Sequence, residues 1–339
     1  MMRLPWFRHE APRTVADAAR ILNAEGAGAM LIAGGTDLLP NMKRRQQVPR
    51  VLVSLRRIES LRATANGSGL TLGGAMTLSS VIGANGVRER YRGLWQAASQ
   101  VATVHLRNMG TLGGNLCLDT RCSYYDQNYE WRKAIDFCMK KDGTVCWVAT
   151  ASKRCVAVSS TDCAPALLAL GATVRLVSNA GERDVALAEF YRNDGMEYMI
   201  RRPDEILTAV ALPDAAGWRS TYWKLRRRGA FDFPVLGVAA AARLDAGGEV
   251  EDARIALGAV SSQPFLSKAG EYLVGKRLTD DVIAEAGRMA ASRAKPMDNT
   301  DYDVYWRKEV VGEYVGYALR ELRGDDMRGT RAKTARLAL

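Results

Sequence analysis

The segment that decides the fold is AMLIAGGTD, residues 29–37, in which a short apolar run leads directly into two glycines. Such a run ended by Gly-Gly predicts a buried strand that stops at a tight turn. TLGGN, residues 111–115, is a second segment of small residues. Consecutive small residues let backbone N–H groups turn toward a bound anion. Either segment alone is typical of an ordinary turn, but together they predict a clamp for a pyrophosphate.

Apolar periodicity on both sides of these loops predicts a mixed α+β chain without internal repeats. Helices are expected at residues 14–24, 91–102, 164–170, 264–273, 280–294 and 304–323. Strands are expected at residues 29–33, 51–55, 70–72, 77–78, 173–177, 235–244 and 251–258. The turn DAGG, residues 245–248, predicts that the last two strands form a hairpin. Residues 213–219 are expected to form a linker.

Composition narrows the class of protein. A length of 339 residues, with 47% hydrophobic and 25% charged residues, predicts two or three compact globular units. No 18-residue apolar run and no apolar signal-peptide core are present, so we expect a cytoplasmic protein with no membrane partner. The formal net charge of +11 favours acidic partners, but the basic residues are scattered and nucleic acid is not expected. Two histidines are too few for a His-rich zinc site.

Two apparent nucleotide motifs are attributed to chance. GAGAML, residues 26–31, lacks the third glycine of a dinucleotide fingerprint and precedes a strand instead of following one. GEYLVGKR, residues 270–277, has arginine where a P-loop needs the hydroxyl residue that holds magnesium. Neither motif therefore supports a nucleotide-binding fold of those classes.

Four cysteines lie in a polar, aromatic stretch that shows neither helical nor strand periodicity: Cys122, Cys138, Cys146 and Cys155. Disulfides are not expected in a reducing compartment, which leaves buried inert thiols or metal ligands. Four thiolates match both a [4Fe-4S] cluster and an all-cysteine zinc site. Zinc sites favour close cysteine pairs, whereas here 15, 7 and 8 residues separate successive cysteines. Long gaps suit either a cluster or thiols that bind no metal, and a scaffold subunit with structural zinc is a further alternative.

Four motifs in a specific order carry a family resemblance: AGGTDLLP, RNMGTLGGN, EILTAVALP and YWKLRRRGAFDFPVLGVAAA. From about residue 5 to about residue 322, the chain resembles the flavin-binding subunit of the molybdenum hydroxylases, the xanthine oxidase family. The resemblance implies an α+β fold with a PCMH-type FAD-binding domain of two subdomains at residues 1–215. A small α/β C-terminal domain at 216–323 and a mobile basic tail at 324–339 would follow. It also implies a molybdopterin-binding large subunit and a [2Fe-2S] small subunit, assembled as a dimer of heterotrimers.

The resemblance further implies which residues contact FAD. The first loop would contribute Leu31, Ile32, Ala33, Gly34, Gly35, Thr36 and Asp37. The second would contribute Thr111, Gly113, Gly114 and Asn115, with Val101 packing nearby. Asp162, in the segment SSTD, would bind the polar chain of the flavin, although the proline usual in this segment is absent. Leu207 would pack on the flavin, and Lys224 would lie near the isoalloxazine ring unless it is an ordinary surface lysine. Tyr191 or Tyr198 could shield the ring, but aromatic residues in loops usually pack locally, so neither is assigned to the site.

The cysteine stretch is an insertion at about residues 117–158, and it resembles that of 4-hydroxybenzoyl-CoA reductases, a branch of the same family. That likeness implies a [4Fe-4S] cluster held by the four cysteines, with Cys117 and Cys163 as buried hydrophobes of the flavin framework. The chain would take electrons from reduced ferredoxin through the cluster and FAD toward [2Fe-2S] and molybdenum. The complex would reductively dehydroxylate an aromatic CoA thioester, with no catalytic residue on this chain. The alternative is a hydroxylase flavoprotein that delivers electrons to NAD or another acceptor.

Overall fold

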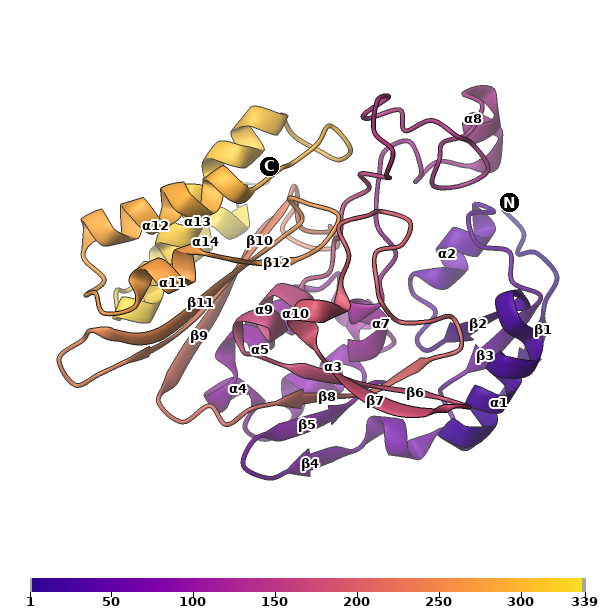
Figure 1. The fold of residues 1–339 in the computed structure, drawn as a ribbon, viewed down its shortest axis with the longest axis horizontal. Coiled ribbons are helices and arrows are strands. Elements are labelled where there is room, and N and C mark those ends of the chain that lie inside the picture. The colour runs from indigo at the N-terminus through magenta and orange to yellow at the C-terminus, as the bar shows by residue number, and fades with distance from the viewer. Residues whose placement is uncertain (1, 337–339) are drawn as a thin grey trace.

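The computed structural model describes residues 2–336 and arranges them around three sheets in the described part of the chain (Figure 1). The first sheet is parallel, in the order β1-β3-β2, and is packed against helix α1. Its elements are β1 (Arg8–Glu10), α1 (Val15–Glu25), β2 (Ala29–Ile32) and β3 (Val51–Ser54). Thr14 caps α1 by accepting a hydrogen bond from Asp17 N. A 3-10 turn, Gly26–Gly28, joins α1 to β2.

The second sheet has five antiparallel strands in the order β4-β5-β8-β6-β7. Its strands are β4 (Thr64–Asn66), β5 (Leu70–Gly73), β6 (Thr173–Ser178), β7 (Gly181–Ala186) and β8 (Ile206–Leu212). The accompanying helices are α3 (Leu78–Gly83), α4 (Val87–Arg90), α5 (Arg92–Gln100), α6 (Val104–Arg107), α7 (Leu112–Leu116), α9 (Cys163–Ala169) and α10 (Leu187–Phe190). A 3-10 turn at Glu59–Arg62 precedes β4. One large apolar core holds this sheet and helices α3, α5 and α9 together.

The third sheet is antiparallel, in the order β12-β11-β10-β9, and helices cover one of its faces (Figure 1). Its strands are β9 (Trp218–Leu225), β10 (Leu236–Leu244), β11 (Val250–Gly258) and β12 (Phe265–Ser267). The covering helices are α11 (Ala269–Leu273), α12 (Asp280–Arg293), α13 (Val304–Arg323) and α14 (Arg328–Arg336). α12 and α13 approach closely because Gly287 lies against Gly312, where an added Cβ would come within 2.8 Å of the Gly312 oxygen.

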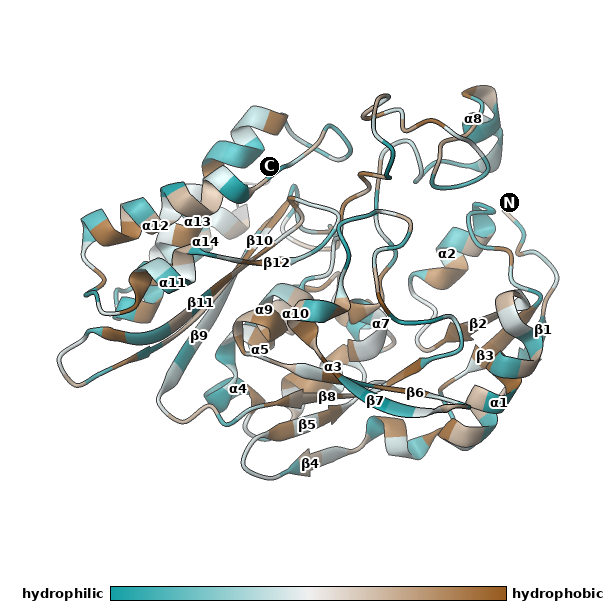
Figure 2. Cartoon of the chain, in the orientation of Figure 1, coloured by the Kyte–Doolittle hydropathy of each residue, from teal (hydrophilic) through white to brown (hydrophobic). Residues whose placement is uncertain are grey.

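Strand β10 is buried on both faces, which explains its continuous run of small apolar residues. Val238, Ala240 and Ala242 belong to the core beneath the C-terminal helices. Ala239 and Ala241 belong instead to the core of the second sheet, since α5 and α9 pack on that side. Figure 2 shows apolar colour along this strand and along β5 and β8. The C-terminal unit and the preceding subdomain therefore share a continuous apolar contact.

Three expectations about local structure are wrong, each because a capping or pairing interaction competes with periodicity. Thr77–Leu78 is not a strand, since Thr77 Oγ1 accepts from Ser80 N and caps α3. The predicted helix at 264–273 is the edge strand β12 followed by the short α11. The predicted linker at 213–219 overlaps the start of β9 at Trp218.

The basic tail is not free in the described part of the chain. Residues Arg328–Arg336 form α14, and Met327 is buried in the C-terminal core. Arg331 Nη2 donates to Thr221 Oγ1 at 2.7 Å, and its guanidinium lies 4.0 Å from the Trp223 ring centroid. The expectation of a mobile tail is therefore wrong up to residue 336, and residues 337–339 lie outside the described part. Within residues 2–336, none of the helices has the length and hydropathy to cross a membrane.

The two ends of the cysteine insertion lie side by side on the rest of the fold. Arg121 and Val158 form an isolated antiparallel bridge, with N–H to O distances of 2.8 and 2.7 Å in the two directions. Beyond this bridge the insertion projects outward and contains one short helix, α8 (Tyr129–Ala134), next to α2 (Leu38–Lys43) (Figure 1). Arg132 Nη2 donates to Arg44 O at 2.9 Å, so the projecting part is anchored at the end of α2.

Candidate functional site

The two glycine segments meet each other in space. A Cβ added to Gly34 would lie 1.9 Å from the Met109 carbonyl oxygen, so only glycine permits this approach. The second loop in turn contacts the second sheet, because Gly113 N donates to Gly74 O at 2.8 Å. Gly35 adopts φ +72°, a left-handed conformation that also favours glycine. The loops therefore form one surface made largely of backbone.

Side-chain hydrogen bonds fix the second loop and join it to the SSTD segment. Thr111 Oγ1 accepts from Gly114 N at 3.1 Å and caps α7. Asn115 Oδ1 accepts from Thr161 Oγ1 at 2.8 Å and from Cys163 N at 3.0 Å. Segments more than forty residues apart are thus held at one site. This contact explains why Asn115 and Asp162 both lie at the same cavity.

A cavity of about 1110 Å³ lies along these loops. Every candidate flavin contact except Lys224 lines it: Leu31, Ile32, Ala33, Gly34, Gly35, Thr36, Asp37, Val101, Thr111, Gly113, Gly114, Asn115, Asp162 and Leu207. Its size suits a large cofactor, and its glycine-rich wall offers backbone groups to a charged one. The residues present therefore fit a dinucleotide such as FAD.

Lys224 lies behind this wall and is not among the lining residues. Its ammonium donates to Asp162 Oδ2 and to Gln100 O, both at 3.0 Å, while Tyr222 OH donates to Asp162 Oδ1 at 2.8 Å. Burial raises the pKa of Asp162 and lowers the pKa of Lys224, and their mutual attraction opposes both shifts. Lys224 is thus neither a surface lysine nor a direct part of the cavity wall, but the partner of the acidic residue that lines it.

Several lining residues were not assigned to the site from the sequence. They are Asp119, Arg121, Tyr198, Arg201, Pro203, Arg227, Arg228, Phe231, Phe233, Asn299 and Asp301. Arg227, Arg228, Phe231 and Phe233 lie in the fourth motif without an assigned role, and the others come from outside the motifs. Arg121 shows why: it forms an ion pair with Asp37 of the first loop and lies 4.8 Å from the Phe233 ring centroid. The two tyrosines also differ. Tyr198 lines the cavity, whereas Tyr191 is buried in the core and donates to Leu116 O at 2.9 Å.

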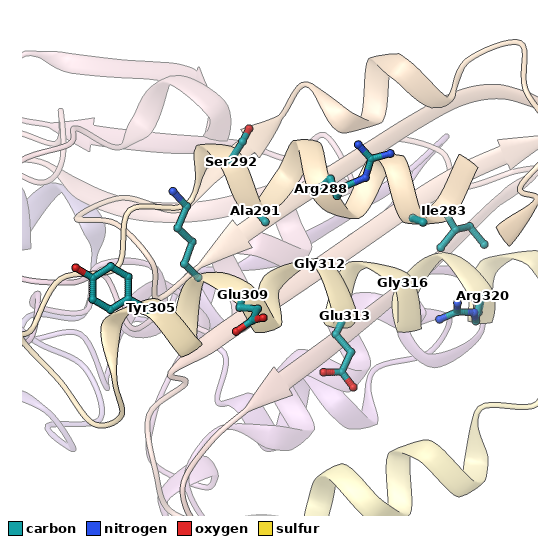
Figure 3. A pocket seen from close by; sticks show the side chains of 12 residues that line it. Ile283, Arg288, Ala291, Ser292, Tyr305, Glu309, Gly312, Glu313, Gly316 and Arg320 are labelled. Carbon is teal, nitrogen blue, oxygen red and sulfur yellow. The ribbon is translucent and has the colours of Figure 1, made fainter. Parts of the chain in front are cut away.

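A second hollow, of about 740 Å³, lies along α12 and α13 (Figure 3). Its floor includes Gly312 and Gly316, and its rim carries charged side chains such as Arg288 and Glu313. Neither glycine loop contributes to it. The cavity at the two loops is therefore the better candidate for a cofactor site.

The four insertion cysteines are brought together and buried. Each is at most 8% exposed, and all are free thiols. Cys122, Cys138 and Cys155 share one small apolar cluster with Tyr125 and Ala157. Cys146 is buried outside this apolar cluster, and it contributes to raising the pKa of the Cys155 thiol. The role of the four cysteines as ligands stays a prediction.

Their arrangement is not a preformed metal site. Among residues 2–336, no three Cys, His, Asp or Glu side chains stand where they could hold a metal ion. Burial raises the pKa of Cys122 to about 12 and that of Cys155 to about 11. A metal would therefore have to supply the energy that ionises these thiols. Cys163 and Cys117 lie elsewhere: Cys163 is fully buried in the flavin-type core, while Cys117 packs against that core and lines the large cavity.

Comparisons with known proteins agree with this geometry. Residues 5–215 match the family model described as the FAD binding domain in molybdopterin dehydrogenase, and residues 220–322 match the CO dehydrogenase flavoprotein C-terminal domain. The chain is 33% identical over 277 residues to the aldehyde oxidoreductase FAD-binding subunit PaoB of Escherichia coli, covering 78% of this chain and 85% of that one. It is 27% identical over 321 residues to the carbon monoxide dehydrogenase medium chain of Hydrogenophaga pseudoflava, covering 93% and 96%.

The fold comparison leads to the same group of proteins. The structure of carbon monoxide dehydrogenase from Hydrogenophaga pseudoflava that lacks the Mo-pyranopterin moiety superimposes with a TM-score of 0.78 and 26% identity. The superposition covers 95% of this chain and 98% of that one. The expected fold class, a PCMH-type domain followed by a smaller C-terminal domain, is confirmed.

Proposed function

Because the chain belongs to the FAD-binding family of the molybdopterin dehydrogenases, we propose that it is a two-centre electron-transfer subunit that carries a [4Fe-4S] cluster besides FAD. The observation that carries the proposal is the position of four buried thiols on an insertion whose base lies at the flavin cavity. The partners would be a molybdopterin-binding large subunit and a [2Fe-2S] small subunit, in a dimer of heterotrimers. Substrate chemistry would then occur on another chain.

The cavity residues have distinct roles toward FAD. FAD, when bound, supplies the one- and two-electron chemistry that amino acids lack. The backbone at Gly34 and Gly113 can approach a pyrophosphate closely, since no side chain intervenes. Asp162 is aligned by Lys224 and Tyr222 to accept hydrogen bonds from the polar chain of the cofactor. Leu207 offers an apolar contact on the cavity wall.

The four cysteines would supply a complete ligand set for a [4Fe-4S] cluster. They are buried, free and grouped, as cluster ligands need to be. Within residues 2–336 no three side chains stand where they could hold a single metal ion, whereas each cysteine of a [4Fe-4S] cluster ligates a different iron. Cluster binding is expected to ionise the four thiols and to stabilise the insertion around them.

For the direction of electron flow, we infer a 4-hydroxybenzoyl-CoA reductase-like complex. Electrons from a reduced ferredoxin would enter this chain at the insertion and leave it from the flavin cavity toward the [2Fe-2S] subunit. The insertion supports this branch, and the net charge of +11 would favour an acidic donor. A second candidate is oxidation of an aldehyde with electrons flowing outward to NAD or another acceptor, which the 33% identity to PaoB favours.

Anaerobic purification of the native complex tests the proposal. We expect co-purifying large and small subunits, a flavin spectrum, and about four irons attributable to this chain. Zinc in place of iron would contradict the cluster and support the scaffold alternative. Reduced ferredoxin with an aromatic CoA thioester should turn over faster than aldehyde with an acceptor. Rapid bleaching by NADH or by aldehydes would instead establish the outward direction.

A further inference from the structure

A buried lysine of the insertion joins the cysteine cluster to the wall of the flavin cavity. Lys140 Nζ donates to Asp119 Oδ1 at 2.8 Å, Thr120 Oγ1 at 2.7 Å and Gly195 O at 2.6 Å. An ammonium has three N–H donors, so all of them are satisfied and the group is fixed in place. The side chains of Lys140 and Asp119 are only 6% and 10% exposed.

On one side, this ammonium group lies next to the cysteines. Gly195, whose carbonyl accepts from Lys140, donates its own N–H to Cys155 O at 2.8 Å. A Cβ on Gly195 would lie 2.6 Å from Cys155 Sγ, so the sulfur rests directly against this glycine. Only the Gly195 backbone therefore separates the ammonium group from a proposed ligand sulfur.

On the other side, the same group contacts the cavity. Asp119 and Tyr198 both line it. Lys140 Nζ lies 5.4 Å from the Tyr198 ring centroid and 4.8 Å from that of Tyr125. Tyr125 OH donates to Asp119 Oδ2 at 3.0 Å, and Tyr125 also packs in the cysteine cluster. One connected set of buried polar groups thus spans the gap between the two sites.

We propose that Lys140 is a positioning residue of the electron-transfer path, whose buried charge raises the reduction potential of the cluster held by the four cysteines. The inference rests on the proposed function, since it requires that cluster. A one-electron reduction adds negative charge to the cluster, and a nearby ammonium in a low-dielectric site stabilises that charge. Asp119 offsets part of the effect, but the ammonium lies between this carboxylate and the Gly195 carbonyl that abuts Cys155.

Potentiometric titration of the cluster, followed by EPR in the anaerobic complex, tests this role. Lys140→Met removes the charge and its hydrogen bonds, Lys140→Gln removes the charge but keeps an N–H donor group, and Lys140→Arg keeps the charge. Lys141→Met is the matched control, because that neighbouring side chain is 35% exposed and pairs only with Asp142. We expect a negative shift of the cluster midpoint potential in the Met and Gln variants. Lys140→Arg and Lys141→Met should stay near the wild-type potential, with FAD content unchanged in all four.

Iron and FAD contents are measured first, because they distinguish an unchanged potential from the loss of a cofactor. Wild-type potentials in both Lys140→Met and Lys140→Gln would overturn the inference. Loss of iron from both variants, with FAD retained, would also overturn it and would make Lys140 a purely structural residue. An iron-free wild-type complex would overturn the proposed function and remove the basis of the inference with it.

Discussion

Lys224 Nζ lies 3.0 Å from Asp162 Oδ2, and the two side chains are 0% and 3% exposed. Lys224 belongs to strand β9 of the C-terminal sheet, whereas Asp162 precedes α9 in the flavin-type domain. The ion pair therefore joins the two folding units at the wall of the cofactor cavity. Buried pairs of this kind cost energy to form, but breaking one leaves an uncompensated charge.

Lys224→Met is expected to destabilise the chain by about 3–5 kcal/mol, because Asp162 would remain buried without its partner. The double variant Asp162→Asn/Lys224→Met should lose less than the sum of the two single variants. Urea unfolding monitored by tryptophan fluorescence measures both effects. Lys308→Met is the control, since Lys308 is exposed on α13 and should unfold like the wild type. Additive losses in the double variant would contradict a direct interaction.

Gly34→Ala is expected to reduce FAD affinity about tenfold or more, because the new methyl group would overlap the Met109 carbonyl and separate the two loops. Gly83→Ala is the matched control, because no atom lies within 4 Å of its added Cβ. The ratio of flavin absorbance to protein after gel filtration gives the measurement. Equal flavin retention in the two variants would show that the first loop does not bind the cofactor.

Glu205→Gln is expected to weaken the acid dependence of stability. Burial would raise the pKa of Glu205, but bonds from Arg183 at 2.7 and 3.0 Å and from Arg202 N at 2.7 Å lower it below 4.5. A carboxylate with a lowered pKa stabilises the fold above the unfolded-state pKa, and this stabilisation is lost as pH falls through the lowered value.

At pH 7 the variant should therefore have a lower melting temperature than the wild type, because its free energy of unfolding is lower by about 2 kcal/mol. The difference between the two melting temperatures should become smaller below about pH 4.5. Thermal melts from pH 7 to pH 3.5 provide the comparison. Glu197→Gln, at a side chain that is 78% exposed, should follow the wild-type profile. A constant gap between Glu205→Gln and wild type at every pH would show that the ionised carboxylate is not responsible.

Cys138→Ser is expected to remove about four irons per protomer while FAD is retained, because one of four ligands would be lost from the insertion only. Cys163→Ala provides the control, since Cys163 lies in the core of the flavin-type domain. That variant should keep the iron content of the wild type. Metal analysis beside the visible spectrum distinguishes the two cofactors. Unchanged iron in Cys138→Ser would count against the proposed ligand set.

The features that the sequence predicted well are those set by neighbouring residues. Helix α13 was expected at 304–323 and occupies Val304–Arg323, because Asp303 caps its start and Gly324, at φ +113°, ends it. The two glycine loops were likewise identified from short local patterns. Both loops line one cavity, and their binding of a pyrophosphate stays a prediction.

The features that the sequence did not predict depend on contacts between distant residues. The burial of Lys224 requires β9 to pair with β10 and α5 to supply Gln100 O, and no local pattern encodes that combination. The partners of Lys140 include Gly195, 55 residues away. Arg121 joins Asp37 only because the insertion returns to the first loop. Such residues can be identified only once the fold is known.

The paired backbones of Arg121 and Val158 make the cysteine segment a stalked appendage whose two ends coincide. Deleting the residues between Arg121 and Val158 would shorten the chain but leave the strand order of all three sheets unchanged. The segment between Arg121 and Val158 is therefore separable from the three sheets as one unit. The bridge between Arg121 and Val158 is the point at which the segment can be excised and the chain rejoined.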